Sequence, residues 1–264
     1  MEFLQNTFVT MFDGSPEKAL RAVLVVMGCY VLTAAPLVAW VLYSLIQKDP
    51  KAKQQLETKA EPQPQVTASD TAFKLIKSRR SVFPKDYTGQ LVSRSVLEQM
   101  LEAANWAPTH GRTEPWRFVV LSPDGLQEMI SITDRVLRAT LDDSAYAKKK
   151  AKLESKAALY PRATFIAICS LRQANPEKLQ PEWEELAATS CAVQNLWLMG
   201  TALGVAGYWS SWQGETVCNS TDMKDLLGIG AEDKCLGFYL VGHSERTSTY
   251  RSKRGDMSDK VVWK

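Results

Sequence analysis

The chain has 264 residues, of which 45% are hydrophobic and 23% are charged, and its formal net charge is +3. These values allow a large buried core, and the near balance of charge gives no case for nucleic acid binding. None of the five cysteines forms a CxxC pair and the two histidines lie far apart, which argues against a disulfide framework and against a zinc site.

Near the N-terminus, the 25 residues from 22 to 46 carry no charge. A helix of this length can cross a hydrocarbon core of about 30 Å. The apolar run is longer than that of a cleaved signal peptide, so we expect a retained single-pass membrane anchor. More lysines follow the span than basic residues precede it, which predicts a membrane protein whose C-terminal part is cytosolic.

These features predict four parts of the chain: a short N-terminal segment (1–21), a transmembrane helix (22–46), a flexible tether (47–69) and a folded domain (70–264). The tether is polar and carries three prolines, so it cannot bury a core.

In the folded domain, helices and short strands alternate. Asp70 is the expected cap of a first helix, and Ser95 with Glu98 resembles a capping box that opens a second. A nearly all-apolar helix from Trp183 to Val205 is expected to be buried on all sides, and a last helix starts at Thr221 and ends at Gly228. Strand patterns cover residues 117–121, 164–169 and 237–242. The pattern predicts an α+β fold with a small sheet wrapped by helices.

Between 142 and 160 the chain is rich in charge and poor in apolar residues. The simpler interpretation is an exposed charged helix. The alternative is a mobile lid over an active site, because few apolar positions would fasten such a helix.

Two short stretches contain residues that could form a functional site. Arg79, Arg80 and Ser81 follow the first helix and supply guanidinium and hydroxyl groups suited to a phosphate. The loop "NWAPTHGRTEPWRF" at 105–118 holds His110 among prolines, a glycine and two tryptophans, which indicates a shaped loop.

Taken in order, "RRS", "WAPTHGRTEPWRFVVL", the small-residue helix, "GVAGYWSS" and "LLGIGAEDKCLGFYLVGH" resemble the FMN-dependent nitroreductase superfamily. The likeness runs from about residue 70 to about residue 242 and is strongest to the compact bacterial subgroup. The anchor and the stretch "TEPW" resemble iodotyrosine deiodinase, another member of the superfamily. The resemblance implies a homodimeric α+β sandwich with FMN at the interface, NAD(P)H as electron donor and no catalytic side chain.

The resemblance also implies the cofactor-binding residues. The motif at Arg79, Arg80 and Ser81 would hold the FMN phosphate and ribityl chain, and Arg254, with Arg251 as the alternative, would complete the phosphate site. Two loops would reach the flavin. One is a segment lent by the partner subunit, and the other lies along the ring; in chain order their residues are Pro108, Thr109, His110, Trp209, Ser210 and Ser211.

Two positions depart from the family pattern. Many members place a basic residue near the flavin N1–C2=O edge, where this chain has Phe83 and Ser210. A missing cation there should disfavour the anionic reduced flavin, unless Lys85 or Arg112 compensates.

By resemblance the function is hydride transfer from NAD(P)H to a flat electron-poor acceptor such as a nitroaromatic or a quinone. One alternative is a reductive dehalogenase of the deiodinase type, with Asp142 and Tyr146 of the lid as substrate clamp and Lys156 as the nearest lysine. The other is a membrane-tethered flavin-binding protein with little turnover.

Overall fold

The computed structural model describes Arg21, Trp40 and residues 67–264. The chain divides into two compact units, Met1–Val66 and Thr67–Lys264. The predicted N-terminal segment, membrane span and tether therefore lie almost wholly outside the described residues, and they stay predictions. Among the residues described, no helix has the length and apolar character needed to cross a membrane.

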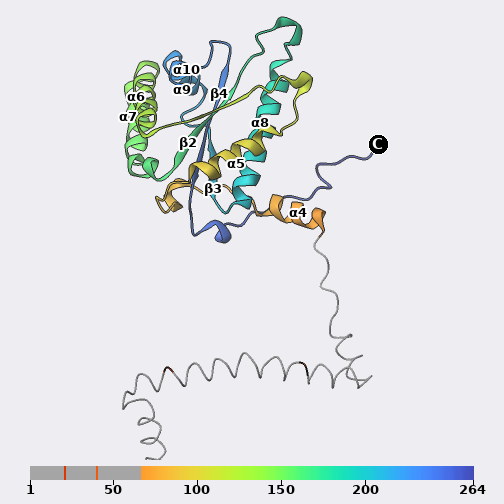
Figure 1. The fold of residues 1–264 in the computed structure, drawn as a ribbon. Coiled ribbons are helices and arrows are strands. Elements are labelled where there is room, and N and C mark those ends of the chain that lie inside the picture. The colour runs from red at the N-terminus through yellow and green to blue at the C-terminus, as the bar shows by residue number, and fades with distance from the viewer. Residues whose placement is uncertain (1–20, 22–39, 41–66) are drawn as a thin grey trace, which may run out of the picture. The chain divides into compact units, whose positions relative to one another are not determined.

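The folded unit contains one four-stranded antiparallel sheet in the order β1-β2-β4-β3, with helices on both sides (Figure 1). The strands are β1 (Trp116–Val120), β2 (Thr164–Ser170), β3 (Ala206–Ser210) and β4 (Lys234–Gly242). The helices are α4 (Ala68–Ser78), α5 (Arg94–Asn105), α6 (Pro123–Thr140), α7 (Asp143–Glu154), α8 (Glu182–Ala202), α9 (Glu215–Cys218) and α10 (Thr221–Leu227). Short 3-10 turns are η1 (Pro84–Asp86), η2 (His110–Arg112), η3 (Ala157–Arg162), η4 (Pro176–Lys178) and η5 (Thr247–Thr249).

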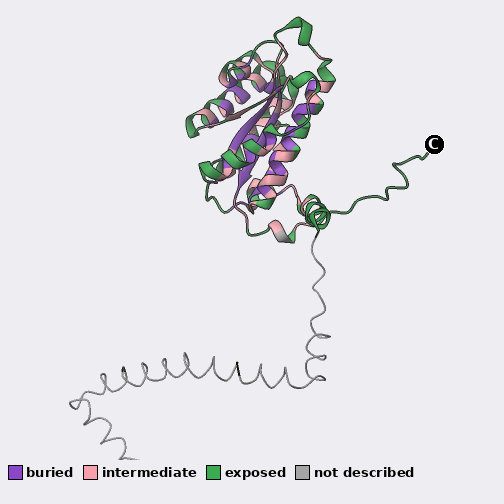
Figure 2. Ribbon diagram, turned by 45° about the vertical axis from the view of Figure 1, so that its right-hand side comes forward, coloured by how far each residue is buried: buried purple, intermediate pink, exposed green. Residues whose placement is uncertain are grey.

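The sheet lies between two helical layers because its central strands are apolar on both faces. Along β2, Phe165 and Ala167 pack into one core cluster with residues of α6 and α10, whereas Ile166 and Ile168 pack into another with residues of α5 and α8. This alternation follows from the two-residue period of a strand. Figure 2 shows the strands as the most buried part of the domain. The predicted α+β sandwich is confirmed.

Two predicted helix starts were wrong. The first helix begins at Ala68 with Thr67 as its cap, and Asp70 is the reciprocal partner that completes a capping box. In the second helix, Ser93 precedes the first residue, so Ser95 and Glu98 lie inside the helix. Ser95 and Glu98 have the residue types and spacing of a capping box, but the helix begins before both of them.

The prediction that the central helix is buried on all sides is wrong for the single chain. The side of α8 that faces the sheet is buried, whereas a stripe of small and polar residues is exposed. The stripe consists of Ala187, Ser190, Cys191 and Gln194. Their spacing of three and four residues places them on one face of the helix.

The predicted charged helix at 142–160 is shorter than expected. It is α7, which ends at Glu154, and η3 continues to Arg162. Leu153 is the one buried residue of α7, so the helix is fastened by few apolar contacts, as expected from the sequence.

Candidate active site

The motif at 79–81 is joined directly to strand β3, which contains Trp209 and Ser210 of the predicted flavin loop. Ser81 forms a parallel bridge with Gly207, and the Val82 amide donates to the Gly207 carbonyl over 3.0 Å. Beside this bridge the rings of Phe83 and Tyr208 lie 4.7 Å apart. The fold therefore brings together two motifs that lie far apart in the sequence.

Three arginines gather at this end of the sheet. The Arg79 guanidinium lies over the Trp197 ring, 4.4 Å from its centroid. Burial lowers the pKa of Arg79, and the positive charges of Arg254 and then Arg80 lower it further. Arg254, one of the two residues predicted to complete the phosphate site, therefore lies within electrostatic reach of Arg79.

This arginine cluster (Arg79, Arg80 and Arg254) has no acidic partner within the described part of the chain. Arg80 donates to the backbone carbonyls of Lys77 and Arg79 over 2.6 and 2.7 Å, but its Nε is buried without a hydrogen-bond partner. A buried donor without a partner costs free energy, and three guanidinium groups without a carboxylate partner repel one another. A phosphate would relieve both costs, so the cluster fits the phosphate of FMN.

A small cavity of about 60 Å³ opens beside Arg80. Hydroxyl-bearing residues contribute to its lining together with the guanidinium: Ser78, Thr201 and Thr247. Hydroxyls and guanidinium groups are donors that anions prefer. Sequence reasoning missed Thr201 and Thr247, because neither lies in a recognisable motif.

The predicted flavin loop is held by close backbone packing. The Trp209 indole donates to the Leu236 carbonyl over 3.0 Å, and the Ser210 hydroxyl accepts from the Trp212 amide over 3.0 Å. Gly237 has φ 105°, and a Cβ placed there would lie 2.2 Å from the Ser210 carbonyl oxygen. Trp212 itself has φ 54°, a strained value for a residue with a side chain.

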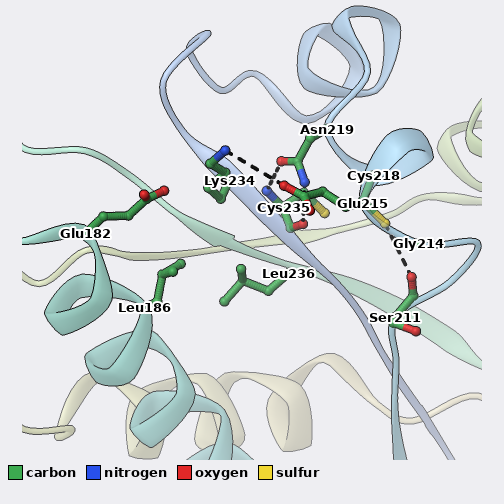
Figure 3. A pocket seen from close by; sticks show the side chains of 10 residues that line it. All are labelled: Glu182, Leu186, Ser211, Gly214, Glu215, Cys218, Asn219, Lys234, Cys235 and Leu236. Carbon is green, nitrogen blue, oxygen red and sulfur yellow. Dashed lines mark hydrogen bonds and ion pairs between the residues drawn. The ribbon is translucent and has the colours of Figure 1, made fainter.

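Two cavities adjoin this loop, and Ser211 lines both. The first, of about 460 Å³, is shown in Figure 3, where Glu182 and Leu186 of α8 face Glu215 and Lys234 across the opening. Its lining mixes acidic and basic groups, and Lys234 pairs with Glu215 at 4.0 Å.

The second cavity, of about 470 Å³, is lined by the flavin-loop residues Ser210 and Ser211 and by the first turn after the arginine motif. Phe83, Lys85 and Ser210 all line it. The expected cation is thus absent at Phe83 and Ser210, but Lys85 stands at the same cavity. Arg112, the other residue considered as a substitute, is not in its lining.

The loop at 108–110 lies elsewhere in the chain. His110 Nδ1 is 2.6 Å from a Glu184 carboxylate oxygen in the first turn of α8, and the hydroxyl groups of Thr109 and Thr113 lie 2.9 Å apart. The loop is sharply shaped, because Arg112 and Glu114 both have positive φ, at 55° and 44°.

Within one chain, this loop and the arginine cluster lie toward opposite ends of α8. His110 contacts Glu184, and Arg79 lies over the ring of Trp197. Glu184 precedes Trp197 by 13 residues along the helix. At 1.5 Å per residue, the two helix positions are about 20 Å apart. Pro108, Thr109 and His110 therefore do not share a site with Arg79 in the same chain.

The two predicted lid residues have structural partners. Asp142 caps α7 by accepting from the Ala145 amide over 2.8 Å. The Tyr146 hydroxyl donates to Asp134 of α6 over 3.0 Å, and the Arg138 guanidinium lies over the Tyr146 ring. Neither Asp142 nor Tyr146 lines the second cavity, whereas Lys156 does.

Comparison with known proteins gives consistent results. The model of the Nitroreductase family matches residues 76–243. A protein of Haemophilus influenzae named "Putative NAD(P)H nitroreductase" is 25% identical over 193 residues, which are 73% of this chain and 98% of that protein.

Two crystal structures share the fold. A nitroreductase-like protein from Bacillus cereus superposes with a TM-score of 0.59 at 20% identity, over 72% of this chain and 94% of that one. A nitroreductase with bound FMN from Bacteroides fragilis superposes with a TM-score of 0.57 at 23% identity, over 73% and 98% of the two chains.

Proposed function

The chain belongs to the nitroreductase family, and we propose that it is an FMN-dependent oxidoreductase that uses NAD(P)H to reduce a flat, electron-poor acceptor such as a nitroaromatic or a quinone. The observation that carries this proposal is the arginine cluster, which lacks an acidic partner in the described part of the chain and adjoins the strand leading to the flavin loop. The names of the relatives, including an NAD(P)H nitroreductase and an FMN-bound structure, support it.

In this proposal the protein supplies binding and position. Arg79, Arg80 and Arg254 hold the phosphate, and the loop from Trp209 to Ser211 sets the place of the flavin ring. When bound, FMN supplies hydride transfer, so no side chain is needed as a nucleophile or general base. The second cavity leaves room for donor and acceptor next to Ser210 and Ser211.

We further propose that the protein is a homodimer with each flavin at the interface. The exposed stripe on α8 is a surface that a second copy would cover. Helix α4 adds the exposed apolar side chains of Phe73 and Ile76, at 62% and 52% exposure. Within one chain, the loop at 108–110 is too far from the arginine cluster to share a flavin site with it. In a two-fold dimer, the loop of one subunit would complete the flavin site that contains the arginine cluster of its partner.

A mixed dimer tests this exchange. One subunit carries Arg79→Ala and the other His110→Ala, and the two are purified together through different affinity tags. If the loop is lent across the interface, one flavin site receives both defects and the other receives none. The mixed dimer should keep about half of the wild-type flavin and activity, whereas both mutant homodimers are impaired at every site.

Glu184→Ala, which removes the carboxylate that holds His110, should behave like His110→Ala in the same mixed dimer. The mass of the wild-type protein is measured first by sedimentation, and a dimer is expected. A monomeric protein, or a mixed dimer no better than the two homodimers, would contradict the exchange.

The function itself is tested with the Thr67–Lys264 fragment and with the full chain. The absorbance spectrum of each purified protein should show bound oxidised flavin. Anaerobic addition of NADH or NADPH should bleach it, and a nitroaromatic should then restore it. Bound flavin that neither nucleotide bleaches would instead favour the alternative of a flavin-binding protein with little turnover.

A further inference from the structure

Four lysines line the cavity of about 470 Å³ next to the flavin loop. They are Lys85, Lys149, Lys152 and Lys156. None of the residues that line this cavity is acidic. The first cavity, by contrast, mixes Glu182 and Glu215 with Lys234.

Three of the lysines come from one face of the lid. Lys149, Lys152 and Lys156 are spaced by three and four residues through α7 and the turn that follows it, which places their side chains on the same side. Lys85 comes from η1, directly after the arginine motif. The positive charges therefore converge on the cavity from two separate elements.

The acidic residues next to these lysines in the sequence do not line the cavity. Asp86, next to Lys85, accepts from Arg246 over 2.8 Å and also from the Tyr250 hydroxyl. Glu154 lines a different cavity, together with Asp134 and Lys150. Lys149 donates to the neutral Gln213 amide oxygen over 3.3 Å. Within the described residues, none of the four cavity lysines forms an ion pair with a carboxylate.

The rest of the lining suits a flat ring. The ring centroids of Tyr160 and Trp212 lie 5.3 Å apart, and the rings of Phe83 and Tyr208 form a second aromatic pair in the lining. Burial raises the pKa of Tyr160 to about 12, so this phenol adds no negative charge at neutral pH. The Trp212 indole is fixed because it donates to Thr133 over 2.8 Å.

We propose that this cavity binds the acceptor, and that the acceptor is a planar aromatic compound bearing a carboxylate, which the lysines of the lid hold over the flavin. This inference rests on the proposed function. Four positive charges in a cavity without a carboxylate repel one another, and an anionic ligand relieves this repulsion. The aromatic pairs then take up the ring, and the volume lies in the range of small-molecule pockets.

The test compares a carboxylate with a neutral analogue of the same ring. The full chain is assayed for NADPH-dependent reduction of 4-nitrobenzoate and of 4-nitrobenzyl alcohol. The variant replaces Lys149, Lys152 and Lys156 by glutamine, which keeps length and helix propensity. The matched control is Lys148→Gln, which removes a positive charge from the same helix but not from the cavity lining.

We expect the wild type to prefer 4-nitrobenzoate. In the triple variant, kcat/KM for 4-nitrobenzoate should fall by at least about tenfold, since charge-assisted hydrogen bonds are lost. The values for 4-nitrobenzyl alcohol and the KM for NADPH should change little, and the control should resemble the wild type. An equal loss for both acceptors would overturn the proposal. So would a loss confined to NADPH, because the lysines would then bind the phosphates of the dinucleotide.

Calorimetric titration of 4-nitrobenzoate into the oxidised protein separates this proposal from the proposed function. Lysine-dependent binding without any NAD(P)H oxidation would reject the proposed enzyme but support the anion site. Binding that is as tight in the triple variant as in the wild type would reject the anion site, even if the enzyme turns over.

Discussion

Replacement of Arg79 by alanine is expected to weaken FMN binding by about tenfold to a hundredfold, with a smaller effect on folding. A hydrogen bond to a charged group contributes about 1.5–3 kcal/mol, and the Arg79 guanidinium is pre-positioned over the Trp197 ring. Arg254→Ala should act in the same direction, because the charge of Arg254 reaches Arg79. The dissociation constant is measured by fluorescence titration of the flavin into the apoprotein.

Riboflavin provides the discriminating ligand, because it lacks the phosphate. Its affinity should be nearly the same in wild type and in both variants. Arg79→Lys should fall between wild type and alanine, since lysine keeps the charge but not the planar fork. Lys77→Ala is the matched control: it removes a nearby positive charge whose partner is the Phe73 ring. Equal losses for FMN and riboflavin would remove these arginines from the phosphate site.

Replacement of Gly237 by alanine is expected to destabilise the domain by about 3 kcal/mol or more and to empty the flavin site. The new Cβ would lie 2.2 Å from the Ser210 carbonyl oxygen, which is backbone and cannot rotate away. Ser210 pairs with Phe238 across β3 and β4, so relief of the clash must part the strands at the flavin loop. Urea unfolding and the flavin content of the purified protein measure both effects.

Gly204 supplies the control, because it also has a positive φ, at 76°, but no atom lies within 4 Å of the place where its Cβ would stand. Gly204→Ala should therefore cost only the backbone strain, about 1–2 kcal/mol, and should leave flavin binding intact. If the two alanine variants unfold at the same urea concentration, the contact with Ser210 has relaxed and the flavin loop is not held as described.

The periodic parts of the chain were predictable from the sequence. Strands β2 and β4 are short apolar runs between turn signals, and α5 shows its inward residues Leu97, Met100 and Ala104 by spacing alone. Which side of each strand or helix faces the core follows from the residue period of that element. The ends of helices were less predictable, because Thr67 and Asp70 are both residue types that can cap a helix, and the sequence pattern does not show which one does.

The ordered motifs indicated the family from the sequence alone, and the chemistry of Arg79 and Arg80 suggested a phosphate site. Their connection to the flavin loop could not be predicted from the sequence. Trp209 and Ser210, expected in a loop along the flavin ring, lie in strand β3, in which Gly207 leaves room for the buried Tyr239 hydroxyl. A Cβ at Gly207 would lie 1.7 Å from that oxygen. Such a close approach depends on a residue of another strand, which no local pattern contains.

By itself, the amino-acid sequence determined the fold class, the family motifs and the residue types suited to a phosphate, because these depend on local periodicity and on chemistry at fixed spacing. Only the tertiary structure decided that Arg254 lies near Arg79, that His110 is held at the far end of α8, and that Lys85 lines the same cavity as three lysines of α7 and the turn after it. Each of these juxtapositions joins residues that are distant in the chain, so no local pattern contains it.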